Sequence, residues 1–190
     1  MKVNVGVSNR HVHLTKESVD ILFGKDYELT FKNKLSQSDQ FAAMETVTVK
    51  GPKEKIEKVR VLGPTRRYNQ VEVSKTDSFK LGINPPVRDS GDIEGSSPIT
   101  IIGPKGVLNL DKGCIIATRH LHANPNDLIK YGLKENQIVS IKINGEKSAI
   151  LDNVHVKVEP GFVFEVHLDT DDANGCLVKQ GDEVELIINE

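Results

Sequence analysis

One arrangement occurs twice in this chain of 190 residues, and it limits the possible folds more than any other feature of the sequence. In each copy an apolar segment runs into Arg-His-x-His, and a helix-capping residue, a short amphipathic segment and a glycine follow. The tetrapeptide is RHVH at residues 10–13 and RHLH at residues 119–122. Because the whole arrangement recurs at matched spacing, it predicts a duplication into two structurally equivalent halves rather than a solenoid.

The first copy predicts a strand followed by a short helix. Valines at alternate positions of residues 3–7 give the period of two that is typical of a half-buried strand. Thr15 is a suitable N-cap for the segment KESVDILF at residues 16–23. Gly24 follows the last apolar residue, where a glycine commonly ends a helix.

The second copy predicts the same order of elements. CIIAT at residues 114–118 is a continuous apolar run of the kind found in buried strands. Asn124 is a good N-cap, Pro125 suits the first helical position, and Gly132 follows the segment DLIKY. In both copies the cap lies four residues after the first histidine, which supports the equivalence of the two halves.

Most of the remaining chain consists of short segments with strand patterns, separated by turns that contain glycine, proline or asparagine. These segments are ETVTVK, KVRVLGP, PITIIG, VLNL, IVSIKI, SAIL, VHVKV, FVFEVHL and EVELII. Their regular spacing favours small β-barrels or sandwiches with a few capping helices. Two intervals lack a clear period: residues 24–44 are polar and carry lysines, and residues 83–97 are rich in Pro, Gly, Asp and Ser. We interpret the first of them as a lid.

Composition excludes several classes of protein. A formal charge of -2 and a pI near 6.3 give no overall field that would attract nucleic acid or an anionic membrane. No apolar run is long enough to cross a bilayer, and the N-terminus lacks the apolar region of a secretory signal. Two cysteines are too few for a disulfide framework, and Cys114 in the run CIIA is interpreted as a small buried thiol. We therefore expect a cytoplasmic protein.

The histidines of the two tetrapeptides form pairs with metal-binding geometry. Residues i and i+2 of a strand project from the same face, so His11 lies beside His13, and His120 beside His122. Neutral imidazole is a common ligand of zinc and of neighbouring metals. The alternative is that each pair is exposed, or satisfied by hydrogen bonds in the core.

Each pair needs further ligands, and two side chains are candidates. His167 follows a strand-like segment and is flanked by acidic and amide residues, whereas His155 alternates with valines and is interpreted as a residue of a strand face. Glu72 lies between Val71 and Val73, where a carboxylate requires a compensating cation. Either a metal or a nearby arginine would provide that cation.

Three arginines surround a Gly-Pro turn: Arg60, Arg66 and Arg67. The segment is not a P-loop, because it lacks the spaced glycines and the Gly-Lys-Ser/Thr ending. Arginines in this position can hold a phosphate through paired charge-assisted hydrogen bonds. A solvated basic turn is the alternative interpretation.

Four segments in this order, VGVSNRHVHLT, LGPTRRYNQVEVSKTD, ATRHLHANP and EVHLDTDDAN, resemble the PduL family of phosphate acyltransferases, also called phosphotransacylases. The resemblance covers essentially the whole chain. It implies a reversible transfer of a short acyl group, acetyl or propanoyl, between coenzyme A and inorganic phosphate. It also implies a homodimer. Family members sent into microcompartments carry an N-terminal extension that is not seen here, which agrees with a cytoplasmic location.

The resemblance implies a mainly β fold with short capping α-helices, in which two small β-barrels share an interleaved chain and the active site lies between them. One barrel is expected from residues 1–9 plus 118–190, and the other from residues 10–23 plus 45–117. Residues 24–44 are expected to form a lid or insert over the active site.

The resemblance also implies roles for individual residues. One metal is expected on His11, His13 and Glu72, with its remaining position taken by the CoA sulfur. A second metal is expected on His120, His122 and His167, with an open position for water or phosphate. Arg66 matches the catalytic arginine that holds phosphate. Contacts with CoA are expected from Ser8, Lys32, Lys34, Arg60, Leu62 and Asn174.

Two rival functions share the same ligands. A non-catalytic module would hold structural zinc in closed shells, and a dinuclear metallohydrolase would cleave thioesters or phosphoesters without phosphate as acceptor. Zinc is the leading candidate for both metals, with cobalt and iron also compatible with imidazole and carboxylate ligands.

Overall fold

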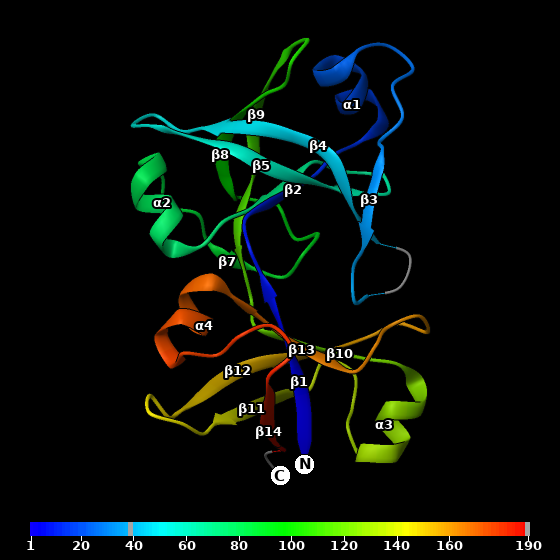
Figure 1. The fold of residues 1–190 in the computed structure, drawn as a ribbon, viewed down its shortest axis with the longest axis vertical. Coiled ribbons are helices and arrows are strands. Elements are labelled where there is room, and N and C mark those ends of the chain that lie inside the picture. The colour runs from blue at the N-terminus through cyan, green and yellow to red at the C-terminus, as the bar shows by residue number, and fades with distance from the viewer. Residues whose placement is uncertain (38–39, 189–190) are drawn as a thin grey trace. The chain divides into compact units, whose positions relative to one another are not determined.

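The structure, a computed structural model, describes residues 1–37 and 40–188 and divides the chain into two compact units (Figure 1). Unit 1 comprises Met1–Asn9, Ser36–Ser38 and Thr118–Glu190, and unit 2 comprises Arg10–Leu35 and Asp39–Ala117. The described residues form 14 strands and four short helices. The expected mainly β fold with capping helices is therefore confirmed.

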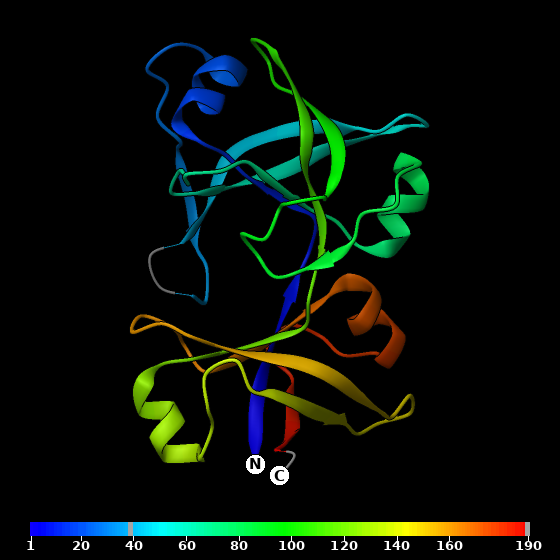
Figure 2. The same cartoon turned by 180° about the vertical axis from the view of Figure 1, so that it is seen from behind.

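Unit 1 contains a closed six-stranded barrel. Its strands, in order around the barrel, are β1 (Lys2–Ser8), β13 (Glu165–Asp169), β10 (His120–Ala123), β12 (Ala149–Val158), β11 (Ile138–Ile143) and β14 (Glu183–Ile187). The interior is filled by fully buried aliphatic side chains that include Val5, Leu121, Ile141 and Val166. Helices α3 (Pro125–Tyr131) and α4 (Thr170–Cys176) lie outside this barrel in both views (Figures 1 and 2).

Unit 2 contains a second ring of six strands. In order they are β4 (Phe41–Lys50), β5 (Lys55–Gly63), β2 (His11–His13), β6 (Gln70–Glu72), β9 (Val107–Ala117) and β8 (Ser97–Ile102), and β8 closes the ring by pairing with β4. Two further strands extend it: β3 (Phe31–Lys34) pairs with β4, and β7 (Val87–Arg88) pairs with β9. Its helices are α1 (Lys16–Phe23) and α2 (Lys75–Leu81).

The two rings have the same pattern of strand directions. Strand β2 is parallel to β5 and antiparallel to β6, and β10 is likewise parallel to β12 and antiparallel to β13. Strand β9 runs parallel to β6 as β1 runs parallel to β13. The strand that precedes each Arg-His-x-His segment belongs to the other unit, so β1 continues into β2, and β9 into β10. The predicted duplication is confirmed, and the chain is interleaved.

The two helices predicted from capping signals are confirmed at their expected bounds. Thr15 accepts a hydrogen bond from the backbone of the first turn of α1, and Asn124 does so for α3. Gly132 ends α3 in the left-handed conformation, with φ of 67°. Helices α2 and α4 were not predicted, although Ser74 and Asp77 form a capping box at the start of α2.

The interval of residues 24–44, expected to be irregular, contains β3 and the start of β4. Strand β3 was not predicted, because all four of its residues are exposed. Its sequence therefore lacks the alternation of apolar and polar residues that marks a half-buried strand. Strands β9 and β12 each join two segments that the sequence suggested as separate, because pairing with neighbours continues between them.

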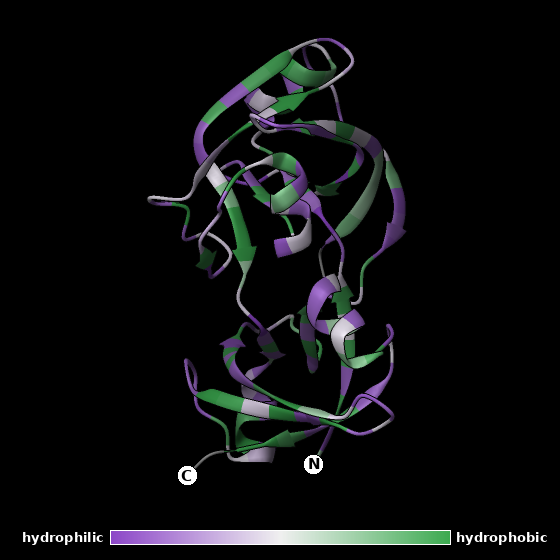
Figure 3. Ribbon diagram, turned by 90° about the vertical axis from the view of Figure 1, so that its left-hand side faces the viewer, coloured by the Kyte–Doolittle hydropathy of each residue, from purple (hydrophilic) through white to green (hydrophobic). Residues whose placement is uncertain are grey.

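Side chains alternate between the two faces of each strand, and the apolar side chains of the inner face form the core of each unit. The strands carry green hydrophobic and purple hydrophilic bands (Figure 3), as the period of two requires. None of the helices in the described part of the chain has the length and apolarity needed to span a bilayer.

Candidate metal centres

The first candidate centre lies on β2 and β6 of unit 2. His11 and His13 project from one face of β2, and the antiparallel register places His11 directly opposite Glu72. The Nε2 atom of His11 lies 3.4 Å from Oε2 of Glu72, and that of His13 lies 3.9 Å from Oε1. The three residues offer ligand atoms that all lie within 4.8 Å of one another. All three are at most 9% exposed.

The chemistry of this group fits a divalent cation. Burial lowers the pKa of His13 well below its usual value, His11 and Arg66 act in the same direction, and Glu72 opposes them. The imidazole of His13 is therefore neutral at neutral pH, as metal binding requires. Its Nδ1 atom is buried and makes no hydrogen bond within residues 1–37 and 40–188. The ring can thus bind a metal without losing a hydrogen bond at that atom.

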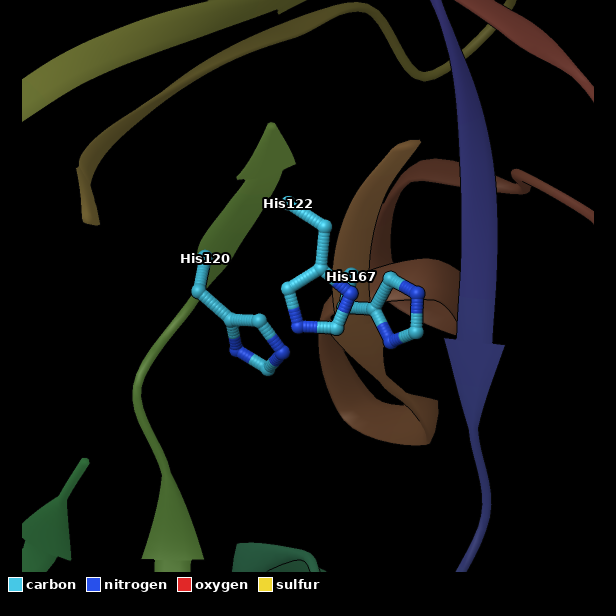
Figure 4. A group of neighbouring side chains, drawn as sticks. All are labelled: His120, His122 and His167. Atoms are coloured by element: carbon cyan, nitrogen blue, oxygen red, sulfur yellow. The ribbon is translucent and has the colours of Figure 1, made fainter. Parts of the chain in front are cut away.

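The second candidate centre lies at the equivalent place in unit 1. His120 and His122 project from β10, and His120 lies opposite His167 of β13. The three imidazole rings converge (Figure 4), with centroids 4.7, 5.1 and 4.5 Å apart for the pairs 120–122, 120–167 and 122–167. Their ligand atoms also lie within 4.8 Å of one another. Three imidazoles are a set that holds catalytic zinc with one position left open.

Two of these rings have hydrogen-bond partners that fix their orientation. The Nδ1 atom of His120 lies 2.7 Å from the carbonyl oxygen of Thr118, so its proton is on Nδ1 and the lone pair on Nε2. The Nε2 atom of His167 lies 2.7 Å from Oε2 of Glu165. Burial raises the pKa of Glu165, but hydrogen bonds from His167, Ser36 and Gln37 outweigh it and bring the pKa below its usual value. His155 lies opposite His120 on β12 and outside the three-histidine group.

Arg66 belongs to unit 2, and its guanidinium contacts only neutral oxygens among the hydrogen bonds of the described residues. Nη1 donates to Tyr68 Oη and to Ser90 Oγ, each at 3.2 Å, and Nη2 donates to Gln40 Oε1 at 3.4 Å. Its backbone N–H donates to the carbonyl oxygen of Leu14, the residue after β2. The side chain thus keeps an uncompensated positive charge in the unit that carries the first candidate centre.

The residues expected to contact CoA are distributed over both units. Arg60 and Leu62 lie on β5, opposite His11 and His13 respectively, and Arg60 donates to the carbonyl oxygens of Ala43 and Met44. The others are Lys32 and Lys34, exposed on β3 in unit 2, and Ser8 at the end of β1 and Asn174, exposed on α4, in unit 1.

Sequence reasoning missed the role of the arginine in each tetrapeptide. Arg10 donates to the carboxylate of Asp77 at 2.8 Å, and Arg119 donates to that of Asp172 at 2.7 Å. Both aspartates lie in the first turn of the helix that follows the strand with the third metal-ligand candidate. The repetition of the arginine itself was the available signal, but its partner is not adjacent in sequence.

Neither cysteine belongs to these groups. Cys114 is fully buried, as expected, and burial together with the negative charge of Asp77 raises the pKa of its thiol to about 12. Cys176 is half-buried on α4, and both thiols are free. A thiol with such a high pKa is a poor nucleophile.

Two interleaved six-stranded barrels, each with a three-residue group able to hold a transition metal, define a duplicated protein with paired candidate metal centres. Residues 4–179 match the sequence model of the family described as phosphate propanoyltransferase. The chain therefore belongs to the phosphate propanoyltransferase family, an acyltransferase family, and the resemblance drawn from its motifs is confirmed.

Relatives from three bacteria carry the name phosphate propanoyltransferase. The one from Thermotoga maritima is 52% identical over 184 residues, which cover 96% of this chain and 88% of the relative. The one from Lachnoclostridium phytofermentans is 50% identical over 97% of this chain and 87% of the relative. The one from Priestia megaterium is 54% identical over 95% of this chain and 83% of the relative.

Proposed function

We propose that this protein catalyses the reversible transfer of a propanoyl group between coenzyme A and inorganic phosphate through a site that uses two divalent metal ions. The observation that carries the proposal is the pair of three-residue groups at equivalent positions of the two barrels. Membership of the phosphate propanoyltransferase family supports the reaction and favours propanoyl over acetyl.

The two groups differ in their third member, which is Glu72 in the first group and His167 in the second, so the two ions can have different tasks. His11, His13 and Glu72 would hold one ion, and His120, His122 and His167 the other. When bound, such ions supply a soft position for the thioester sulfur and a Lewis acid for phosphate, and zinc satisfies both requirements. The carboxylate gives the first group one more negative charge than the second.

Arg66 is proposed to bind phosphate. Arg10 and Arg119 are each paired with an aspartate, so their charges are already compensated, whereas the hydrogen bonds of Arg66 go to neutral oxygens. A free guanidinium charge binds a phosphate dianion through two parallel N–H···O bonds. The positive charge of Arg66 would reduce the repulsion between the bound phosphate and the thioester carbonyl, and the two hydrogen bonds would turn one phosphate oxygen toward that carbonyl.

The reaction then needs no covalent intermediate on the protein. A phosphate oxygen forms the new bond to the carbonyl carbon, the carbon–sulfur bond breaks, and the electron pair leaves with the CoA sulfur. The proton of monohydrogen phosphate ends on that sulfur, so the products are acyl phosphate and the free CoA thiol. The buried thiol of Cys114, with a pKa of about 12, is unsuited to carry an acyl group. The mechanism requires both groups to serve one pair of reactants, as the resemblance to the family implies.

Further features of the proposal concern binding. Exposed lysines on β3, Lys32 and Lys34, are suited to a CoA phosphate. Residues 24–44 are proposed as a lid, of which residues 38 and 39 lie outside the described part of the chain. Ser8, Arg60, Leu62 and Asn174 are proposed as the other CoA contacts. We also propose that the protein works as a cytoplasmic homodimer.

The test is a thiol-release assay with propanoyl-CoA and acetyl-CoA, in the presence and absence of phosphate. Acyl phosphate is trapped as its hydroxamate, and each assay is repeated after chelation and after zinc is restored. We expect thiol release that depends on phosphate, yields acyl phosphate, is lost on chelation and returns with zinc. Higher kcat/KM for propanoyl-CoA than for acetyl-CoA is expected.

Each rival predicts a different result. A dinuclear metallohydrolase would release thiol without phosphate, and a structural zinc module would bind zinc but release no thiol. Full activity after complete removal of metal would contradict the two-metal site while leaving acyl transfer intact.

A further inference from the structure

Two buried residues outside the candidate ligand groups occupy equivalent places in the two barrels. Gln70 lies opposite His13 across β2 and β6, and Glu165 lies opposite His122 across β10 and β13. Each comes two residues before the third member of its group and so projects from the same face of the strand. Gln70 is fully buried and Glu165 is 6% exposed.

Each of these residues contacts the third member of its group with complementary polarity. The third member in unit 2 is the acceptor Glu72, and Gln70 Nε2 donates to its Oε1 at 2.6 Å. The third member in unit 1 is His167, and its Nε2 lies 2.7 Å from the carboxylate of Glu165. A donor therefore accompanies the carboxylate, and an acceptor accompanies the imidazole.

The orientation of Gln70 is fixed by a second contact. The backbone N–H of Gly91 donates to Gln70 Oε1 at 2.8 Å, so the amide oxygen faces Gly91 and the NH2 group faces Glu72. Gln70 Nε2 also donates to Ser90 Oγ at 2.9 Å, and Ser90 Oγ accepts from Arg66. One amide thus connects the candidate ligand Glu72 to the proposed phosphate arginine.

The orientation of Glu165 is fixed in a similar way. Its Oε2 accepts hydrogen bonds from Ser36 Oγ and from Gln37 Nε2, and the amide of Gln37 is held by Val163, whose N–H donates to Gln37 Oε1. An ionised carboxylate only accepts, so the proton of the neutral His167 ring lies on Nε2. Gln37 Nε2 also lies 3.5 Å from His167 Nε2. This contact is longer than the 2.7 Å contact between His167 Nε2 and Glu165 Oε2, so Glu165 is the hydrogen-bond partner of that nitrogen.

A glycine leaves space for the Glu165–His167 pair. Gly6 of β1 lies opposite His167, and a Cβ atom at this position would come within 2.9 Å of both Glu165 Oε2 and His167 Nε2. Figure 4 shows that one ring nitrogen of His167 points away from the other two rings.

From these contacts we propose that Gln70 and Glu165 are positioning residues of the two metal centres. Gln70 holds Glu72 toward its centre, and Glu165 holds His167 in the tautomer that bears its proton on Nε2 and its lone pair on Nδ1. The inference rests on the metal-binding part of the proposed function. Partners of this kind contribute about 10- to 100-fold to metal affinity.

The first test uses the wild-type protein. Zinc content is measured after loading, and correlation spectra of 15N-labelled histidine side chains then identify the tautomers. We expect two zinc ions per chain, with His167 protonated on Nε2 and His120 on Nδ1. Two bound zinc ions with His167 protonated on Nδ1 would overturn this inference alone, whereas a protein that binds no zinc would also overturn the two-metal part of the proposed function.

The second test uses two isosteric variants, each of which is the matched control for the other. Glu165→Gln should weaken zinc binding about 10- to 100-fold only at the three-histidine centre, which is the second candidate centre with His120, His122 and His167. Gln70→Glu should do so only at the His11 centre, which is the first candidate centre with His11, His13 and Glu72. Chelator competition measures the two affinities, and the visible spectrum of the cobalt-loaded protein reports ligand geometry. Glu183→Gln, at an exposed position of β14, should change neither.

Circular dichroism decides whether each variant is folded. A folded variant with both zinc affinities and the cobalt spectrum unchanged would overturn the assignment for that residue. If Glu165→Gln does not fold, the tautomer of His167 in the wild-type protein decides whether Glu165 is a positioning residue. For Gln70, the milder variant Gln70→Asn, which shortens the amide by one methylene, should weaken zinc binding at the His11 centre.

Discussion

Arg119 binds both carboxylate oxygens of Asp172, with Nε–Oδ2 and Nη2–Oδ1 distances of 2.7 Å each. Asp172 lies in the first turn of α4, where its own N–H donates to the N-cap Asp169 at 2.8 Å. Arg10 and Asp77 form the corresponding pair in unit 2, where Nε of Arg10 lies 2.8 Å from Oδ2 of Asp77. The arginine of each tetrapeptide thus fastens its strand to the helix that follows the third candidate ligand, and it is not available to phosphate.

Arg119→Ala is expected to destabilise the protein by about 1–2 kcal/mol, because the pair is bidentate and less than a third exposed. Urea denaturation of Arg119→Ala, Asp172→Asn and the double variant gives the coupling energy. Lys2→Ala breaks the exposed pair with Glu183 and should leave the midpoint unchanged. A coupling energy of zero for Arg119 and Asp172 would contradict the structural role.

Removal of one histidine from each centre should separate the two metals. We expect His11→Ala and His120→Ala each to lower the zinc content from two ions per chain to one and to abolish most activity, since each loses one of three ligands. Metal analysis after dialysis measures the content. His155→Ala, outside the group, is the control and should keep both ions. Full activity of dialysed His11→Ala would refute the two-metal mechanism.

Arg66→Ala should keep both zinc ions and impair the use of phosphate. We expect the KM for phosphate to rise or kcat to fall by about 10-fold or more, because a charge-assisted hydrogen-bonding partner of phosphate is lost. The KM for propanoyl-CoA should change less. Steady-state kinetics with each substrate varied gives both constants, and Arg67→Ala, the exposed neighbour, should behave as wild type. An unchanged phosphate KM and kcat in Arg66→Ala would contradict the assignment.

Gly6→Ala should weaken the three-histidine centre. The added methyl group would lie 2.9 Å from both Glu165 Oε2 and His167 Nε2, so one of these side chains must move. We expect weaker zinc binding there and no change at the His11 centre, measured by chelator competition. Gly175→Ala on α4 is the control, since a Cβ there meets no atom within 4 Å.

The two cysteines should differ in reactivity. The pKa of Cys114 is raised to about 12, above the ordinary 9.0, so its reactive thiolate is scarce at mildly alkaline pH, where Cys176 reacts first. Titration with a disulfide reagent should show one accessible thiol in the native protein and two after unfolding. Rapid modification of Cys114 in Cys176→Ser would contradict this difference. Cys114→Ala should remain active.

Local signals predicted part of the fold. Thr15 and Asn124 marked two helices because a cap is a contact between residues three apart or fewer. The same kind of cap begins α4 at Asp169, but this helix of seven residues contains little apolar surface, so no periodic pattern supported it. Strand β3 was missed because its stability comes from pairing with β4, which the sequence of β3 alone does not reveal.

The candidate site was likewise predicted only in part from the sequence. The paired histidines and Glu72 were found because their spacing and their apolar neighbours are visible in sequence. The partners of Arg10 and Arg119 lie 67 and 53 positions away, and the contacts of Gln70 and Glu165 depend on strand register. Contacts of this kind become apparent only when the strands are paired.

The position of β1 has a consequence for synthesis on the ribosome. This strand is made before residues 10–117, whereas both of its neighbours, β13 and β14, are made after them. Residues 10–117 supply every strand of the other ring, so that ring can close while β1 still has unpaired edges. Synthesis of β13 and β14 is therefore the event that gives β1 its neighbours, and a protein truncated before β13 leaves β1 without a sheet.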